Sequence, residues 1–89
     1  MKARNIIEEG SFRSDLERLV PDDKWADVIL EAAWNWFPLY ADDGRQVPGT
    51  DFLEKTVPDW VNGRNLSIHY RIDGDSVRLY AILEYSLFG

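Results

Sequence analysis

The sequence LSIHYRIDGDSVRLYAILEYS, residues Leu66–Ser86, has the alternation and the central turn of two antiparallel strands. Asp73-Gly74 is a strong two-residue turn signal, because such pairs tolerate the positive φ that tight hairpins need. Side chains in a strand alternate between faces with period two, so the apolar positions share one face of the hairpin. The stretch therefore predicts a β-hairpin with one apolar and one polar side.

The predicted pairing depends on which two residues form the turn, but the faces do not. A turn at Asp73-Gly74 places Tyr70 opposite Val77, whereas a turn at Gly74-Asp75 changes the partners and keeps the faces. The face expected toward the helices comprises Leu66, Ile68, Tyr70, Ile72, Val77, Leu79, Ala81 and Leu83. The opposite face comprises Ser67, His69, Arg71, Arg78, Tyr80 and Glu84.

Upstream of the hairpin, an apolar-centred segment predicts a first strand over Arg4 to Glu8. SFRSDLERLV then predicts a helix. Ser14 and Glu17 have the spacing of a capping box, and Ser11 is an alternative cap. The apolar face of this helix consists of Phe12, Leu16, Leu19 and Val20.

The clearest helical pattern in the chain is DDKWADVILEAAWNWF. Pro21 ends the preceding helix and suits the first position of this one, and Pro38 is expected to stop it. Apolar residues recur at helical spacing at Trp25, Val28, Ile29, Ala32 and Trp36. The two predicted helices form an αα-hairpin.

The remaining segments complete an α+β fold. YADDGRQVPGT is expected to be a loop, Phe52 to Val57 a strand, and VNGRN a turn. The order is an N-terminal strand, an αα-hairpin and two or three strands, so we expect an antiparallel β-sheet in a single domain over residues 1–89.

The composition is that of one small folded domain. Hydrophobic residues make up 45% of the 89 and aromatic residues 13%, which is sufficient for a packed core. No apolar run approaches the ~20 residues that span a bilayer, and two acids occupy the N-terminal stretch where a signal peptide needs apolar residues. Cysteine is absent. We therefore expect a cytoplasmic protein with no disulfide, no thiolate metal site and no membrane partner.

The net charge of −6 disfavours nucleic acid as a partner. Sixteen acids oppose ten bases, and residues 1–43 hold ten of those acids with five of the bases. Proteins that bind phosphates are usually basic, because released counterions drive that binding. A protein partner therefore suits this chain better than RNA, DNA or the ribosome.

The order of the elements and two motifs resemble the RelE/ParE superfamily of bacterial toxins. In NIIEEGSFRSDLERL, the family's opening strand and helix are matched by Phe12, Asp15, Leu16 and Leu19. In HYRIDGDSVRLYAILEY, the family's closing hairpin is matched by Tyr70, Arg71, Ile72, Asp73 and Gly74. The resemblance implies a strand, a helical hairpin and an antiparallel sheet in a toxin that acts on a macromolecular target.

The sequence departs from the RNA-cleaving branch of that family. Those members typically carry an arginine three residues before the tyrosine matched by Tyr70, and here that residue is Ser67. Their basic cluster before this strand is reduced to Lys55 and Arg64. Members that grip a protein, as ParE toxins do with DNA gyrase, do not depend on those residues. We therefore expect a toxin-like or phage-encoded inhibitor that binds a target protein, with an antitoxin as a further expected partner.

The alternative function is a metal-independent mRNA endoribonuclease that works with the ribosome. Its catalytic residues would be His69 for proton transfer, Arg71 and Arg78 for the phosphate, and Tyr85. The first three also suit the solvated face of an antiparallel sheet with no catalytic role. A lone histidine and scattered carboxylates predict no metal site, and we expect no cofactor.

The candidate partner-binding residues are apolar. Trp34 lies about 180° around the second helix from Trp25, at 100° per residue, and Leu30 lies one turn before it. Trp34 either packs against the first helix or belongs to a partner or dimer surface, where tryptophan is enriched. Leu87 and Phe88 either cap the core or insert into a partner. The predicted interface residues are therefore Leu30, Trp34, Leu87 and Phe88.

Overall fold

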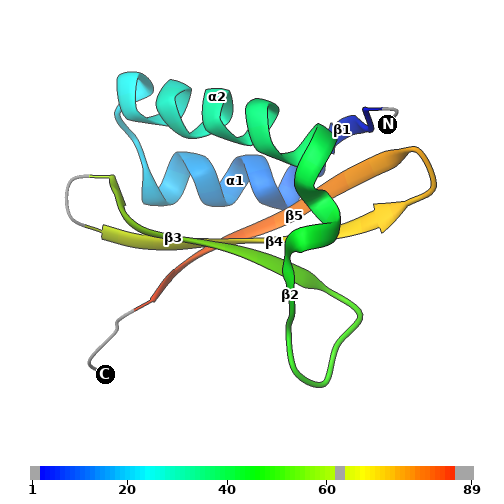
Figure 1. Ribbon diagram of the computed structural model, residues 1–89. Helices are drawn as coiled ribbons and strands as arrows, with labels where there is room; N and C mark the ends of the chain where they lie inside the picture. The colour runs from blue at the N-terminus through cyan, green and yellow to red at the C-terminus, as the bar shows by residue number, and fades with distance from the viewer. Residues whose placement is uncertain (1–2, 62–63, 86–89) are drawn as a thin grey trace.

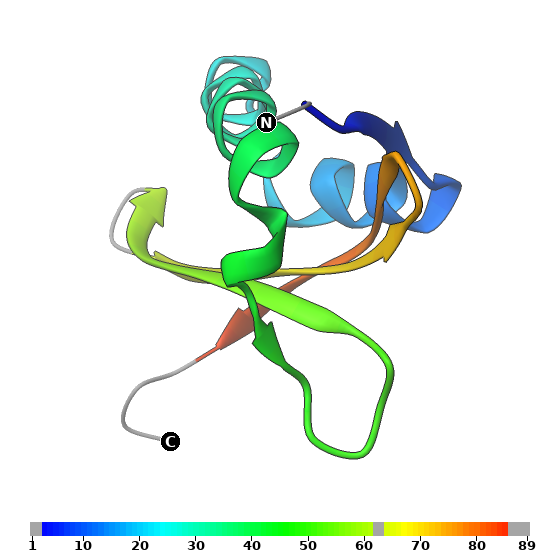
Figure 2. The same ribbon diagram turned by 45° about the vertical axis from the view of Figure 1, so that its right-hand side comes forward.

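The computed structural model of the chain describes residues 3–61 and 64–85, with residues 57–61 and 85 described by their backbone alone. Two helices lie on one side of a five-stranded sheet, as Figure 1 and Figure 2 show. The predicted α+β class is therefore correct. The elements in chain order are β1 (Asn5–Glu8), α1 (Gly10–Leu19), α2 (Asp23–Tyr40), the 3-10 helix η1 (Ala41–Asp43), β2 (Arg45–Gln46), β3 (Leu53–Val61), β4 (Arg64–Asp73) and β5 (Ser76–Tyr85).

The sheet is mixed rather than purely antiparallel. Its strands lie in the order β1-β5-β4-β3-β2, and β1 pairs with β5 in parallel, while the other three pairings are antiparallel. The chain leaves β1 through the helical hairpin and returns through three strands, so β5 arrives beside β1 in the same direction. The expected antiparallel sheet is thus wrong at this edge, and the predicted loop contains the short strand β2.

Helix α1 begins without a side-chain cap. Its N-cap residue is Glu9, and no side chain bonds the free amides of the first turn. The predicted caps, Ser11 or Ser14 paired with Glu17, are wrong because these residues lie inside the helix. The apolar face was predicted correctly, since Leu19 is partly buried and the fully buried residues are Phe12, Leu16 and Val20.

Helix α2 starts and ends later than predicted. Asp22 is its N-cap, and the Asp22 carboxylate accepts the backbone N–H of Lys24 at 2.9 Å, so Pro21 lies outside the helix. The helix then continues through Pro38 to Tyr40. Proline removes one intrahelical hydrogen bond, and in the final turn that loss does not end the helix. The carbonyl oxygen of Pro38 accepts the N–H of Arg4 at 3.0 Å, which ties the helix end to the start of β1.

The buried face of α2 is rotated from the predicted one. Ile29, Ala33 and Phe37, spaced four residues apart, are at most 1% exposed. Trp25 and Val28, expected on the core face, are 37% and 39% exposed. Helix α2 is apolar on more than one side, so periodicity alone does not determine which side is covered.

The terminal hairpin turns at Gly74-Asp75. Asp73 lies opposite Ser76, and Gly74 has φ of +59°, which glycine adopts without strain. The register built on a turn at Asp73-Gly74 is therefore wrong, and the alternative turn is the one observed.

A β-bulge interrupts the pairing of β4 with β5. Tyr70 lies opposite Leu79, and the next pair is His69 with Ala81, so Tyr80 is an extra residue in β5. A bulge of this kind shifts the alternation of every residue that follows it.

The residues after the bulge have the opposite phase from the prediction. Ile82 is fully buried, whereas Leu83 is 44% exposed and Ala81 pairs with the outward-facing His69. The inward assignments of Ala81 and Leu83 are therefore wrong. Glu84, predicted to face outward, pairs with Arg64 on the helix side at 2.8 Å, and Arg64 also donates to the last carbonyl of α1.

Beyond Leu79, side chains of α1 take the place of β1 along the edge of β5. β1 pairs with β5 only as far as Leu79. The Ser11 hydroxyl donates to the carbonyl oxygen of Tyr80 at 2.6 Å, and the Asp15 carboxylate accepts the N–H of Ile82 at 3.1 Å. These bonds satisfy backbone groups that the end of β1 would otherwise leave unpaired at the edge of β5.

Tyr70 joins the sheet to the end of the helical layer. Its ring is fully buried and packs edge-on against Phe37, with ring centroids 4.7 Å apart. The hydroxyl donates to the carbonyl oxygen of Ala41 at 2.5 Å. Gly44 lies so close to this hydroxyl that a Cβ there would be 1.7 Å from it. Burial raises the pKa of Tyr70 to about 12.

Candidate functional site

The sheet face opposite the helices carries a polar cluster centred on Glu54 of β3. Its carboxylate lies 3.2 Å from Nε of Arg45 in β2 and 3.5 Å from Nε2 of His69 in β4. The Ser67 hydroxyl donates to the same carboxylate at 3.3 Å. The carboxylate is only 13% exposed, so the cluster is a cross-strand network in which one acid faces two bases.

Arg71 occupies a separate position on the same face. Its guanidinium lies over the ring of Phe52 at 4.4 Å and near the ring of Tyr80 at 5.8 Å. The two rings meet edge-on, with centroids 5.2 Å apart. Arg71 is 44% exposed, and its nearest carboxylate is that of Asp51 at 3.8 Å. Stacking and a distant acid hold this arginine, which keeps part of its surface open.

Arg78 is engaged by two acids. Nη1 lies 2.9 Å from Glu9, and Nε lies 3.2 Å from Asp73. The hydrogen bond to Glu9, followed by that to Asp73, raises the pKa of Arg78 above its ordinary value. Arg78 is therefore a fixed cation with its charge already matched.

The predicted catalytic residues are brought together in part. His69, Arg71 and Arg78 belong to one face, as the strand periodicity predicts, and Arg71 is the direct partner of Arg78. Tyr85 pairs with Asn65 at the end of β5, and its side chain lies outside the described residues. Glu54 was not predicted from the sequence, because only the β3–β4 register places it opposite His69.

This face is poorly suited to an anion. Each described base on it contacts at least one carboxylate, and the acid beside His69 is nearly buried. A phosphate bound there would displace an existing ion pair and would meet Glu54 at close range. Among the residues that the structure describes, no group of three histidine or acidic side chains could hold a metal ion.

The second candidate site lies beside α2. Trp34 is 45% exposed and lies outside the hydrophobic core, so it does not pack fully against α1. It lines a shallow hollow of about 300 Å³ together with Leu30, Glu31 and, from β1 and α1, Glu8 and Arg13. Leu30 and Trp34 are thus neighbours on one surface, as the sequence predicts. Leu87 and Phe88 lie outside the described residues.

A further apolar set on α2 was not anticipated as exposed. It lies on the flank away from Trp34, and its members are Trp25, Val28, Leu39 and Tyr40, between 37% and 49% exposed. Trp36, on the same side, lies under the ammonium of Lys55 at 4.6 Å. Helical spacing reveals the apolar stripe but not its exposure, because exposure depends on how α2 packs against the rest of the chain.

Comparison with known proteins finds no matching family model, no matching curated protein and no matching solved structure. Within residues 3–61 and 64–85, neither helix combines the length and the hydropathy of a bilayer-spanning segment.

Proposed function

We propose that this chain is a toxin-like inhibitor of the RelE/ParE type that binds a macromolecular target, a protein rather than RNA. The observation that carries the proposal is Trp34, a large aromatic side chain left 45% exposed beside Leu30 on a helix that has a complete buried face elsewhere. Tryptophan contributes more to protein interfaces than most residues, because it buries a large rigid surface.

Two further features support a protein partner. The net charge of −6 opposes binding to any polyanion. The order of strand, helical hairpin and sheet is the one that the resemblance to the RelE/ParE superfamily implies, and some members of that superfamily act by binding a protein. An antitoxin would be a further partner of the same surface.

A second candidate function is cleavage of mRNA at the ribosome. Arg71 over the rings of Phe52 and Tyr80 favours it, since aromatic rings and a guanidinium are the groups on which an unstacked base can lie. His69 would transfer the proton and Arg78 would hold the phosphate. The carboxylates of Glu54, Glu9 and Asp73 beside these bases weigh against it.

The test is induced expression of a tagged chain in a bacterial host. We expect growth arrest and co-purification of a defined target protein. Trp34→Ala should abolish both while changing the melting temperature by less than about 3 °C, since an exposed side chain contributes little to the fold. Trp25→Ala is the matched control, because Trp25 is a 37% exposed tryptophan on the opposite side of the same helix.

Three results would reject the proposal. The first is normal growth with no retained target, and the second is growth arrest that Trp34→Ala leaves intact. In the third, Trp34→Ala chiefly lowers the melting temperature, which would assign Trp34 to the core.

A further inference from the structure

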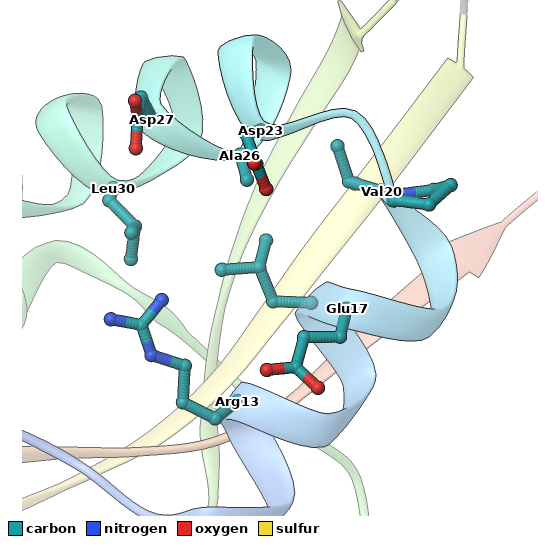
Figure 3. A pocket seen from close by; sticks show the side chains of 9 residues that line it. Arg13, Glu17, Val20, Asp23, Ala26, Asp27 and Leu30 are labelled. Carbon is teal, nitrogen blue, oxygen red and sulfur yellow. The ribbon is translucent and has the colours of Figure 1, made fainter.

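A groove runs along the seam between α1 and α2. Figure 3 shows it from close by, with side chains of both helices around it. Its volume is about 420 Å³. Leu16, Val20 and Leu30 supply its apolar lining, and Glu17, Asp23 and Asp27 supply carboxylates.

The groove continues toward Trp34. The hollow beside Trp34 shares Arg13 and Leu30 with the groove, so the two adjoin along the helical hairpin. Leu30 is half-buried in its middle, and Trp34 forms an exposed apolar end. The seam between the helices is lined mainly by polar side chains, and the hollow beside Trp34 is lined mainly by apolar surface. A charged seam next to an apolar hollow is a surface on which a third, amphipathic helix can pack.

The charges around the groove are unbalanced. Glu17, Asp27 and Glu31 are exposed, and no hydrogen bond or ion pair joins their carboxylates to another described residue. The single base in the lining is Arg13, and its Nε already lies 3.3 Å from Glu8. Both helices therefore present uncompensated negative charge around the partly exposed Leu30 and Trp34.

The negative charge around the groove determines which kind of partner can bind there. Nucleic acid and acidic membrane surfaces would be repelled. A second copy of the chain, docked groove to groove by two-fold symmetry, would place acidic rim against acidic rim. A helix with lysine or arginine on both sides of an apolar stripe would match the depression in shape and in charge.

We propose that the α1–α2 groove receives a basic amphipathic helix of a partner protein. Apolar side chains of that helix enter the seam beside Leu30 and Trp34, and its basic side chains face Glu17, Asp27 and Glu31. The inference rests on the proposed function and specifies the partner chemistry of the same site.

The experiment uses the purified full chain and a synthetic probe. The probe is a fluorescent peptide of about four helical turns, with leucine at helical spacing on one face and lysine elsewhere. The control peptide replaces every lysine with glutamate. We expect saturable binding of the lysine peptide by fluorescence anisotropy, weakening as NaCl is raised, and no binding of the glutamate peptide.

Two variants locate the binding. Trp34→Ala should weaken binding at least about 30-fold, the size expected for a buried aromatic anchor. The triple variant Glu17→Gln, Asp27→Asn, Glu31→Gln should weaken it about tenfold, because each rim pair contributes modestly. A matched triple, Asp42→Asn, Asp43→Asn, Asp51→Asn, makes the same charge change away from the groove and should leave binding within about twofold.

Each contrary outcome overturns the inference. Equal binding of both peptides would remove the charge argument, and equal weakening by both triples would make the attraction a property of net charge alone. A dimer in sedimentation velocity that Trp34→Ala dissociates would make the occupant a second copy. If growth arrest requires Trp34 while the lysine peptide fails to bind, the proposed function stands and the groove inference fails.

Discussion

Arg71 and Arg78 lie directly opposite each other in β4 and β5, and their guanidinium groups turn to different carboxylates. Arg71 stacks on Phe52 near Asp51, whereas Arg78 contacts Glu9 and Asp73. Two adjacent arginines therefore do not converge on a common anion. To bind a phosphate, Arg78 would have to give up a hydrogen bond to Glu9 or Asp73, and Arg71 would have to turn from Asp51.

The triple variant His69→Ala, Arg71→Ala, Arg78→Ala should retain growth arrest. A ribonuclease built on this face would lose proton transfer and phosphate stabilisation together, each worth roughly 10²-fold or more in rate. A protein that acts through the α2 surface would lose none of its interface. Wild-type protein should cleave no RNA with or without ribosomes, as measured by primer extension. Cleavage that disappears in the triple variant would instead favour the ribonuclease.

Leu79→Asp and Leu83→Asp should have opposite outcomes. Leu79 is fully buried, so an unpaired carboxylate there costs several kcal/mol and should unfold the domain. Leu83 is 44% exposed because the bulge at Tyr80 shifts its phase, and its replacement should change the free energy of unfolding by less than about 1 kcal/mol. Urea denaturation followed by circular dichroism measures both. Equal destabilisation would mean that the bulge is absent.

Stability should fall at alkaline pH through Tyr70. Folding raises its pKa from 10.0 to about 12, because a buried phenolate would lack the solvation that it has in water. The stabilisation is therefore fully present below pH 10 and is lost as the pH rises toward 12, with a total on the order of 2–3 kcal/mol. Urea titrations at several pH values should show this decline in wild type and a smaller one in Tyr70→Phe. Parallel pH profiles of the two proteins would contradict the assignment.

Ser11→Ala should destabilise the fold more than Ser14→Ala. The Ser11 hydroxyl donates to the carbonyl oxygen of Tyr80, and its removal leaves that acceptor without this bond at a cost of about 1 kcal/mol. Ser14 is an exposed residue within α1, where alanine is the better helix former. Chemical denaturation separates the two. Greater destabilisation by Ser14→Ala would restore the capping role expected from the sequence.

Local patterns in the sequence were sufficient for the element types and for much of the core. Alternation in the hairpin predicted the buried positions up to Leu79, and helical spacing predicted the buried face of α1. The pattern failed at Tyr80, because a bulge adds one residue without any compositional signal. It also failed for β1, since the direction of a strand relative to a distant partner depends on the path of the whole chain.

For the candidate sites, the sequence predicted which residues share a face of the sheet or of the helix, but not which side chains contact one another. Strand phase placed His69, Arg71 and Arg78 together, but the register of β3 was needed to bring Glu54 to His69. Helix phase placed Leu30 beside Trp34. The groove next to them depends on how α1 and α2 pack, which no local pattern in either helix specifies.

The position of β1 beside β5 has a consequence for the order in which the chain folds. Helix α1 packs chiefly on β5, and β1 has its pairing partner there as well, yet β5 is synthesised after every other described element. Contacts between segments so distant in sequence form slowly, because a long loop must close first. Until residues 76–85 have emerged, the buried face of α1 has no sheet to cover it. The nascent chain therefore exposes Phe12 and Leu16, and it becomes a native fold only when its last strand enters between the first strand and β4.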